Sequence, residues 1–504
     1  MAFLVSPGIN VSETDLTHVV PNVSTTIGAI AGSYQWGPVM ERITVTSENE
    51  LIKTFGKPTD HTFQHVLSAA NYLAYANNLI VVRNVGPVAK NAAVGDIVDG
   101  TNKLVKNKDD YDASSFTDQV FIAKYPGTLG NSLKAIAIDS IGWGVAASAV
   151  TGNSATADQK AFISHFNGSP GTSTDVAKVN GSNDEIHILV IDEGGQFTGT
   201  AGQVLETWAY ISMAKDALRI DGSSNYVKNV LANESDYVWL GSELNLTGNS
   251  DDTSPLKNAG SPKMGADFKR FTKNSAAYYP GGSLGGVSAN EGVDDNQITP
   301  AVEQLAYTLY NNPDVVDVTL LMQGGCTVAT GATLTAMAES RKDCIALVSP
   351  DKGTVVGAAA GGIIDGVIAD KGTMGSSNYG VMDSAYKYQY DKYRDMFVYL
   401  PMNADIAGLC ARTDFTNDAW YSPAGLNRGQ IKNIIKLSYD ASQADRDKLY
   451  KAGCNPFNQS TGQGIILYGD KTMQIVPSAF DRINVRRLFI VLEKAIYCSK
   501  INVV

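Results

Sequence analysis

Charged residues are scarce in this sequence. Asp, Glu, Lys and Arg make up only 18% of its 504 residues, against roughly a quarter in typical soluble proteins. A low charge fraction fits a protein that buries much of its surface against partners. The net charge is -11, and no long run of Lys and Arg occurs. Because phosphate binding requires clustered basic residues, we expect no direct contact with nucleic acid.

Cysteines and long apolar runs are also few. The five cysteines lie apart without a Cys-x-x-Cys pair, which fits a reducing compartment and predicts small buried side chains rather than metal ligands. The most apolar window, Val355–Ala369, is short and interrupted by Asp365, so we expect no membrane insertion. The opening MAFLVSP contains no basic residue, and no signal peptide is predicted.

Motifs of catalytic, metal and nucleotide sites occur only in incomplete form. Gly281–Gly285 matches the G-x-S-x-G elbow of hydrolases, but a proline precedes it and all five histidines come earlier in the chain. His61 and His65 have the spacing of zinc ligands but lack the zincin glutamate and a third ligand. Gly469–Thr472 resembles the end of a phosphate loop, but an aspartate stands where glycine is required. We therefore predict no catalytic residue, metal or cofactor.

The glycine pair Gly324-Gly325 leaves an alternative open. It lies between a predicted strand and a predicted helix, although the full G-x-G-x-x-G pattern of dinucleotide sites is missing. In this alternative, the chain is an α/β enzyme with a β-rich insertion and a ligand site at these glycines. A rise in melting temperature with added nucleotide would favour it.

The chain begins with a predicted arm, followed by a layered core. Residues 1–20 form an extended N-terminal arm, in which apolar and polar residues alternate over Ile9–Ser12 as in a strand. No hairpin partner follows nearby, so the arm either frays or joins another sheet. Residues 21–85 are the first part of an α/β core, because helices lie between a buried strand at Thr25–Gly32 and another at Leu79–Val85.

Residues 86–300 differ from the flanking residues in sequence pattern and are predicted to be an inserted β-rich region. Short strands, such as Phe121–Tyr125 and Glu185–Asp192, alternate with clusters of Gly, Ser, Thr and Asn. One helix is predicted near Val204–Met213. Because the α/β pattern returns afterwards, we expect a peripheral module whose two ends lie close together.

Residues 301–480 are predicted to complete the α/β core. A strand at Val315–Met322, a helix and a strand at Ile345–Val348 make a βαβ-type unit with parallel strands. Their apolar runs need cover on both faces, so we expect them to share one sheet with Leu79–Val85. The predicted fold class is α/β: a core of βαβ-type units, a β-rich inserted domain and an extended N-terminal arm.

Residues 481–504 predict a C-terminal helix with one apolar face. The predicted core face consists of Val485, Leu488, Phe489, Leu492 and Ile496. Charged residues fall off this face and are expected to be solvated: Arg486, Arg487, Glu493 and Lys494.

The second half of the chain is organised around one stretch, Tyr386–Gln430. It predicts a buried strand at Met396–Pro401 and a helix that begins at Asn403 or Asp405. Its segments ADIAGLCARTD and SPAGLNRGQ resemble the contractile tail sheath proteins of bacteriophages. Further segments with the same resemblance are SPGINVSET at Ser6–Thr14, AGSYQWGP at Ala31–Pro38, YQYDKY at Tyr388–Tyr393, LYGDKT at Leu467–Thr472 and FDRINVRRLF at Phe480–Phe489.

The resemblance implies a structural protein rather than an enzyme. Sheath subunits polymerise around a tail tube and contract, which drives the tube through the host cell envelope during genome delivery. The implied partners are other sheath subunits, the tail tube protein, and the baseplate and tail terminator proteins. The implied location is the tail of the virion, after synthesis in the host cytoplasm.

The resemblance also implies roles for both ends of the chain. The arm would lend a strand to a neighbouring subunit through Ile9, Asn10, Val11, Ser12 and Glu13. The C-terminal helix would face the tube, with Arg486, Arg487 and Lys494 as candidate contacts. Sheath chains normally continue past this helix, so the end at Val504 implies a missing C-terminal region. We therefore expect this polypeptide alone to be mainly monomeric.

Overall fold

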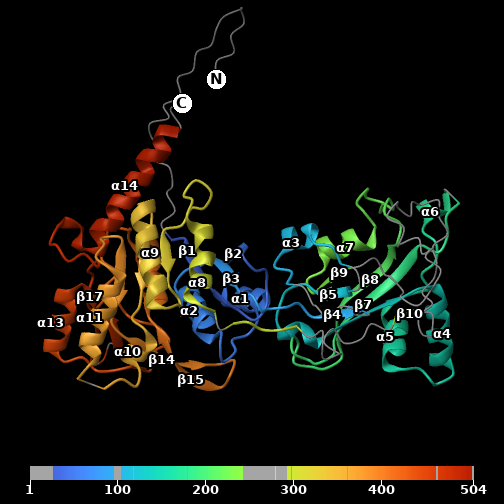
Figure 1. Ribbon diagram of the computed structural model, residues 1–504, viewed down its shortest axis with the longest axis horizontal. Helices are drawn as coiled ribbons and strands as arrows, with labels where there is room; N and C mark the ends of the chain where they lie inside the picture. The colour runs from blue at the N-terminus through green and yellow to red at the C-terminus, as the bar shows by residue number, and fades with distance from the viewer. Residues whose placement is uncertain are drawn as a thin grey trace, which may run out of the picture.

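The computed structural model describes residues 26–95, 104–116, 119–178, 180–241, 278–279, 292–296, 298–359, 361–460, 462 and 464–501. Helices and strands are mixed throughout, as the sequence predicts, and the described residues form two lobes (Figure 1). The large lobe consists of the described residues within 26–85 and 296–501. The small lobe consists of those within 88–293, and short linkers connect the two.

A sheet that has seven strands among the described residues forms the centre of the large lobe. The strand order is β17-β13-β12-β11-β1-β3-β2, and every neighbouring pair is parallel except β3 with β2. The strands are β1 (Gly28–Ser33), β2 (Arg42–Val45), β3 (Leu79–Asn84), β11 (Leu320–Met322), β12 (Ile345–Val348), β13 (Gly380–Asp383) and β17 (Cys454–Asn455). The three strands predicted to share one sheet therefore do so, as β3, β11 and β12.

Glycines on β1 let helix α2 (Phe63–Leu73) approach the sheet closely. A Cβ atom at Gly28 would lie 2.6 Å from the ring of Tyr72, and one at Gly32 would lie 2.3 Å from Nδ1 of His65. Both contacts are too short for a side chain, and alternate strand residues share a face. Helix α2 therefore covers the face of β1 to which Gly28 and Gly32 belong.

Pairs of helices cover the two faces of this sheet. Helix α2 packs against α12 (Asn403–Thr416), and α8 (Pro300–Tyr307) packs against α9 (Val328–Arg341). The step from β1 to β3 and the step from β11 to β12 run in opposite directions along the sheet, so right-handed crossovers place their helices on opposite faces. The remaining helices of this part are α1 (Glu48–Phe55), α10 (Lys352–Val355), α11 (Ile363–Met374) and α13 (Gln443–Ala452).

A smaller antiparallel sheet lies at the lower side of the large lobe in Figure 1, where β14 (Tyr386–Asp391) pairs with β15 (Met396–Pro401) and β16 (Lys436–Leu437). Strands β18 (Phe457–Ser460) and β19 (Gly464–Leu467) form a separate hairpin. Helix α14 (Ile483–Ile501) projects from the upper side of the lobe in Figure 1.

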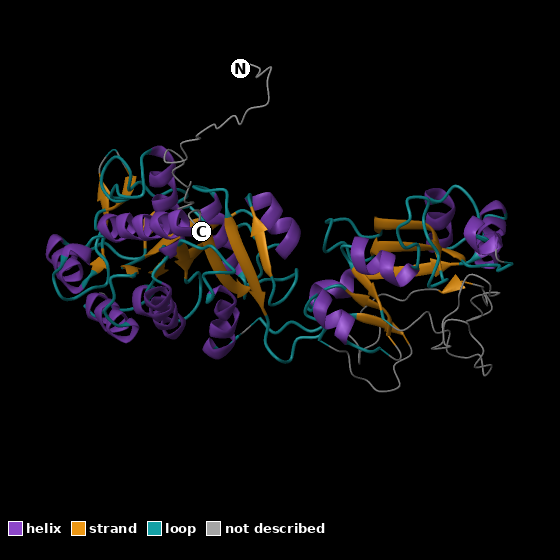
Figure 2. Ribbon diagram, turned by 90° about the horizontal axis from the view of Figure 1, so that it is seen from above, coloured by secondary structure: helices purple, strands orange, loops and turns teal. Residues whose placement is uncertain are grey.

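The small lobe has antiparallel sheets of its own, with strand orders β10-β6-β7-β8 and β4-β5-β9 among the described residues. Figure 2 shows it beside the large lobe, seen from above. Its strands are β4 (Ala93–Gly95), β5 (Gln119–Ala123), β6 (Leu133–Ile138), β7 (Glu185–Asp192), β8 (Gln203–Ser212), β9 (Val238–Leu240) and β10 (Tyr278–Tyr279). Its helices are α3 (Lys108–Ala113), α4 (Ser140–Thr151), α5 (Ala157–His165), α6 (Thr174–Lys178) and α7 (Val227–Glu234).

The structure corrects two predicted elements. The helix predicted near Val204–Met213 is strand β8, because its β-branched and aromatic residues pair along almost their whole length with β7. The strand predicted at Val315–Met322 is shortened to β11. Val315 is exposed and belongs to a turn over residues 313–315, in which the backbone N–H groups of Val315 and Val316 donate to the carbonyl oxygen of Asn312 at 3.3 Å and 3.1 Å, and residues 316–318 form no strand.

Candidate assembly surfaces

Helix α14 is anchored through a face that the sequence did not predict. Over residues 483–496, where burial is described, its buried residues are Ile483, Arg486, Arg487 and Ile490. Three residues of the predicted core face are instead exposed, namely Phe489 (39%), Leu492 (46%) and Ile496 (58%). The predicted orientation of this helix is therefore wrong, and so is the prediction that Arg486 and Arg487 are solvated.

Arg487 connects α14 to α12. Its guanidinium forms an ion pair with Asp414, and Nη1 lies 3.4 Å from the carbonyl oxygen of Cys410. Burial by itself would lower the pKa of Arg487, but the neighbouring Cys410 and Asp414 outweigh it and raise that pKa. The cation is held between two elements of its own chain, which gives the base of α14 a fixed attachment.

Arg486 and Lys494 also have partners within the chain. The guanidinium of Arg486 lies 4.3 Å from the ring centre of Tyr379 and 4.7 Å from that of Phe480, an arrangement of the cation–π type. Nζ of Lys494 lies 2.6 Å from a carboxylate oxygen of Asp317. The structure thus places the predicted tube-facing cations in contacts with the large lobe.

The exposed residues Phe489, Leu492 and Ile496 follow each other at i, i+3 and i+7, and we call them the α14 stripe. This spacing puts the three side chains on one face of the helix. They belong to a helix that projects from the lobe (Figure 1). An exposed apolar face of this kind is a candidate surface for contact with another protein.

A buried ion pair lies within the stretch Tyr386–Gln430. Nζ of Lys387 on β14 lies 2.9 Å from Oδ1 of Asp405 on α12, and both side chains are completely buried. The hydroxyl of Tyr75 also donates to this oxygen, at 3.3 Å. Burial lowers the pKa of Lys387 and raises that of Asp405. The pair fixes strand β14 against the first turn of α12.

The crevice at Gly324-Gly325, the alternative ligand site, is filled by the protein itself. The side chain of Asn403 accepts a hydrogen bond from the backbone N–H of Gly324 at 3.0 Å and donates to its carbonyl oxygen at 3.0 Å. A Cβ atom at Gly325 would lie 2.5 Å from Gln64. The backbone N–H and carbonyl oxygen of Gly324 are therefore engaged by α12, and Gln64 of α2 packs against Gly325.

The remaining site candidates from the sequence either pack or pair within the chain or lie outside the described residues. His61 is exposed and His65 is buried, and no group of three or more His, Cys, Asp or Glu within the described ranges is placed to hold a metal ion. Asp470 of the loop-like motif forms an ion pair with Arg482 at 2.6 Å. Residues Ile9, Asn10, Val11, Ser12 and Glu13, like Gly281–Gly285, lie outside the described residues. In the part that the structure describes, no helix has the length and apolarity needed to cross a membrane.

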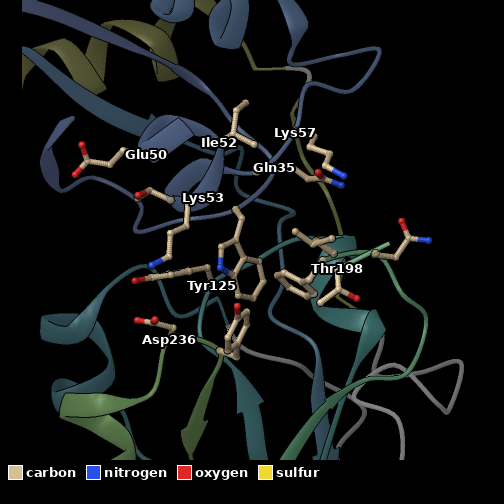
Figure 3. A pocket seen from close by; sticks show the side chains of 15 residues that line it. Gln35, Glu50, Ile52, Lys53, Lys57, Tyr125, Thr198 and Asp236 are labelled. Carbon is tan, nitrogen blue, oxygen red and sulfur yellow. The ribbon is translucent and has the colours of Figure 1, made fainter. Parts of the chain in front are cut away.

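A cleft of about 450 Å³ separates the two lobes on one side. Lys53, from α1 of the large lobe, and Asp236, from the small lobe, extend into it from opposite walls (Figure 3). Aromatic side chains, among them Trp36, Tyr125 and Phe197, form much of its lining. Sequence reasoning missed this junction, because its residues lie far apart in the chain and match no motif.

Two family models match this chain. The phage tail sheath protein central domain matches residues 313–473, and the tail sheath protein Gp18 domain III N-terminal region matches residues 25–83. The tail sheath protein of Enterobacteria phage T4 is 32% identical over 569 aligned residues, which cover 97% of this chain and 85% of the relative. The tail sheath protein of Vibrio phage KVP40 is 29% identical, with coverage of 98% and 86%.

Among solved structures, the sheath tail protein Lin1278 from Listeria innocua matches with a TM-score of 0.49 and 9% identity, over 93% of this chain and 75% of that chain. The family assignment depends on the sequence matches, which extend over most of both chains and include a relative with 32% identity. This chain belongs to the phage tail sheath protein family.

Proposed function

We propose that the chain is the structural subunit of a contractile phage tail sheath. It polymerises around the tail tube and contracts, which drives the tube through the host cell envelope during genome delivery. Its partners are other sheath subunits, the tail tube protein, and the baseplate and tail terminator proteins. Its place is the tail of the virion, after synthesis in the host cytoplasm. The observation that carries the proposal is the membership of the chain in the tail sheath protein family, and the α14 stripe adds an apolar surface on a projecting helix.

The proposed mechanism is mechanical, so the chain is not an enzyme and needs no cofactor. Head-to-tail contacts between copies generate open helical assemblies. Contraction exchanges one set of contacts between rigid subunits for another, and the free-energy difference between the two packings drives the movement. The filled crevice at Gly324-Gly325 supports this view, since the alternative enzyme would need that space for a ligand.

We assign contact with the tail tube to the α14 stripe. Arg487 and Arg486 then act as anchors that orient the helix, because their cations are held by α12 and by aromatic rings. Exposed Phe and Leu side chains at helical spacing are typical of a helix that docks into a groove of a partner. Lys494 lies at the edge of the stripe, paired with Asp317.

Co-sedimentation of the chain with purified tail tubes tests this assignment. Leu492→Asp places a charge in the centre of the stripe and is expected to abolish tube binding, because burying an unpaired carboxylate is costly. Glu493→Gln, at the neighbouring exposed position, is the matched control and should bind like the unmodified chain. Equal binding by the Leu492→Asp chain and the control would refute the role of the stripe.

We also propose the following division of the chain. Residues 21–85 and 301–480 form a core of βαβ-type units, and residues 86–300 form an inserted β-rich domain. Support comes from the linkers, where the backbone N–H of Gly86 donates to the carbonyl oxygen of Asp295 at 2.9 Å, and Lys90 and Val293 exchange two backbone hydrogen bonds of 3.1 Å. Residues 1–20 form an N-terminal arm, whose strand Ile9–Glu13 joins a neighbouring subunit, and residues 481–504 form the C-terminal helix.

A further inference from the structure

The junction between the lobes is built around one buried cation. Arg83, at the end of β3, is 1% exposed. Its guanidinium donates to the carbonyl oxygens of Tyr34 (3.0 Å), Gly37 (2.8 Å) and Gln35 (3.2 Å) in the large lobe. The same group donates to the carbonyl oxygen of Pro126 in the small lobe at 2.7 Å. A single side chain therefore ties a loop of the large lobe to the small lobe.

The loop that Arg83 holds carries Trp36, whose ring inserts into the small lobe. Trp36 is 4% exposed and packs within the hydrophobic core of the small lobe, although it belongs to the large lobe. Its ring meets those of Tyr125 and Phe197 edge-on, with centroids 5.3 Å and 5.1 Å away. Gly37 allows the turn beside it, with a φ angle of 97° that a larger residue would adopt only with strain.

Short hydrogen-bonded linkers complete the junction. The N–H of Val88 donates to the carboxylate of Asp295 at 3.0 Å, and the N–H of Thr128 donates to that of Asp294 at 2.9 Å. A further contact joins the large-lobe residue Val39 to the small lobe, since its N–H donates to the carbonyl oxygen of Lys106 at 2.8 Å. Linkers that allow free domain motion make few contacts, whereas these linkers are held by several hydrogen bonds.

The cleft beside the junction provides room for the lobes to close. Lys53 and Asp236 point into it from opposite walls (Figure 3), so their attraction favours closure. Trp36 and Arg83 oppose closure. Rotation of the small lobe would withdraw Trp36 from the core of that lobe, and the buried guanidinium of Arg83 would lose the carbonyl oxygen of Pro126. Both losses are costly for buried groups.

We propose that Arg83 and Trp36 are positioning residues that hold the small lobe at one fixed orientation with the cleft open. The small lobe is then a rigid extension of the large lobe rather than a hinged flap. This inference goes beyond the proposed sheath function, and it rests on the proposed division of the chain only in treating the small lobe as a unit. A rigid junction carries the small lobe along with any movement of the large lobe.

Pulsed electron paramagnetic resonance on the intact chain tests the proposal directly. Spin labels at Ala301→Cys on α8 and Asn233→Cys on α7 report the distance between the lobes, since both positions are exposed. Cys498→Ser removes the one cysteine whose side chain is outside the described set, and the other four are buried. The unmodified junction should give a single narrow distance peak.

Variants at the junction separate positioning from folding. Arg83→Met and Trp36→Ala should each lose the narrow peak, and Arg83→Lys, which keeps the charge, should restore part of it. Arg42→Met on β2 is the matched control, since within the described part of the chain this exposed arginine donates to the large lobe, to the carbonyl oxygen of Leu309 at 3.1 Å. The control should keep the peak.

A broad distribution in the chain with an unmodified junction would overturn the proposal, and this result does not depend on whether any variant folds. A narrow peak that survives both Arg83→Met and Trp36→Ala would overturn it as well. Neither result depends on tube binding. Failure of the sheath assignment and failure of the rigid junction are therefore distinguishable.

Discussion

Buried charged and polar side chains fix the details of the large lobe at the scale of single residues. The completely buried pair of Lys387 and Asp405 joins a strand to a helix, and a buried pair tolerates the loss of one partner poorly. His65 lies against β1 with no hydrogen-bond partner for Nδ1 among the described residues, and burial lowers its pKa to about 4. These two sites lead to separate predictions.

Asp405→Asn should destabilise the protein by about 3–5 kcal/mol, because it leaves the ammonium group of Lys387 buried without a counter-charge. Chemical denaturation followed by circular dichroism measures the change in the free energy of unfolding. Asp365→Asn is the matched control, since this carboxylate pairs with Lys448 at an exposed site and should cost less than about 1 kcal/mol. Equal effects of the two substitutions would contradict this account of the buried pair.

His65 should make the protein less stable in acid. The unfolded chain binds a proton at this histidine below its ordinary pKa of about 6.5, whereas the folded chain binds it only below about 4. Between these values the unfolded state holds more protons, so stability falls as the pH falls, by about 3 kcal/mol in total. Below about pH 4 the loss is complete.

Denaturation of a His65→Gln variant between pH 7 and pH 4 measures this contribution, since the variant should show a weaker loss of stability over that range. His61→Gln, at an exposed position on the same segment, should keep the pH dependence of the unmodified protein. An unchanged pH dependence in the His65→Gln variant would rule out the proposed cause.

Individual strands and helices show how far the sequence predicts the structure. The continuous apolar runs of β3 and β12 identified both strands, since each needs cover on two faces. The sequence of strand β8 predicts a helix because apolar residues such as Val204, Trp208 and Ile211 also fit helical spacing. Only the presence of β7 beside it decides between the two.

Helix α14 shows that a sequence can predict a helix without predicting how the helix packs. Its apolar spacing predicted the helix itself, but not the face that packs. The partner of Arg487 is Asp414, which lies on another helix and 73 residues away in the chain, so the sequence offers no sign of this pairing. The same reason explains why the junction around Arg83 was missed.

Arg487→Met should loosen the base of α14, because it leaves Asp414 buried without its cation. Hydrogen–deuterium exchange should then be faster in α14 and in the last turn of α12 than in the rest of the protein. Glu493→Gln, exposed on the same helix, removes only a charge, because its amide oxygen can still accept the 3.4 Å contact from Arg486, and it should leave the exchange unchanged. Uniform acceleration across all elements, or none in α14, would argue against a local anchor.

At the scale of the whole molecule, the division into two lobes can be tested by deletion of the small lobe. Lys90 and Val293 exchange two backbone hydrogen bonds, so a two-residue Asn-Gly turn should close the gap that remains when the residues between them are removed. The shortened chain should be soluble and unfold in one cooperative transition by calorimetry. Aggregated or unfolded product would count against the proposed boundaries of the inserted domain.

Electron cryomicroscopy of the protein bound to the tail tubes of the phage that encodes it tests the central claim most directly. The proposed function predicts a regular helical coat on the tube, in which α14 faces the tube surface through Phe489, Leu492 and Ile496 and the small lobe lies farther from the axis. Bare tubes in the presence of folded protein, or a coat in which α14 points away from the tube, would contradict the account.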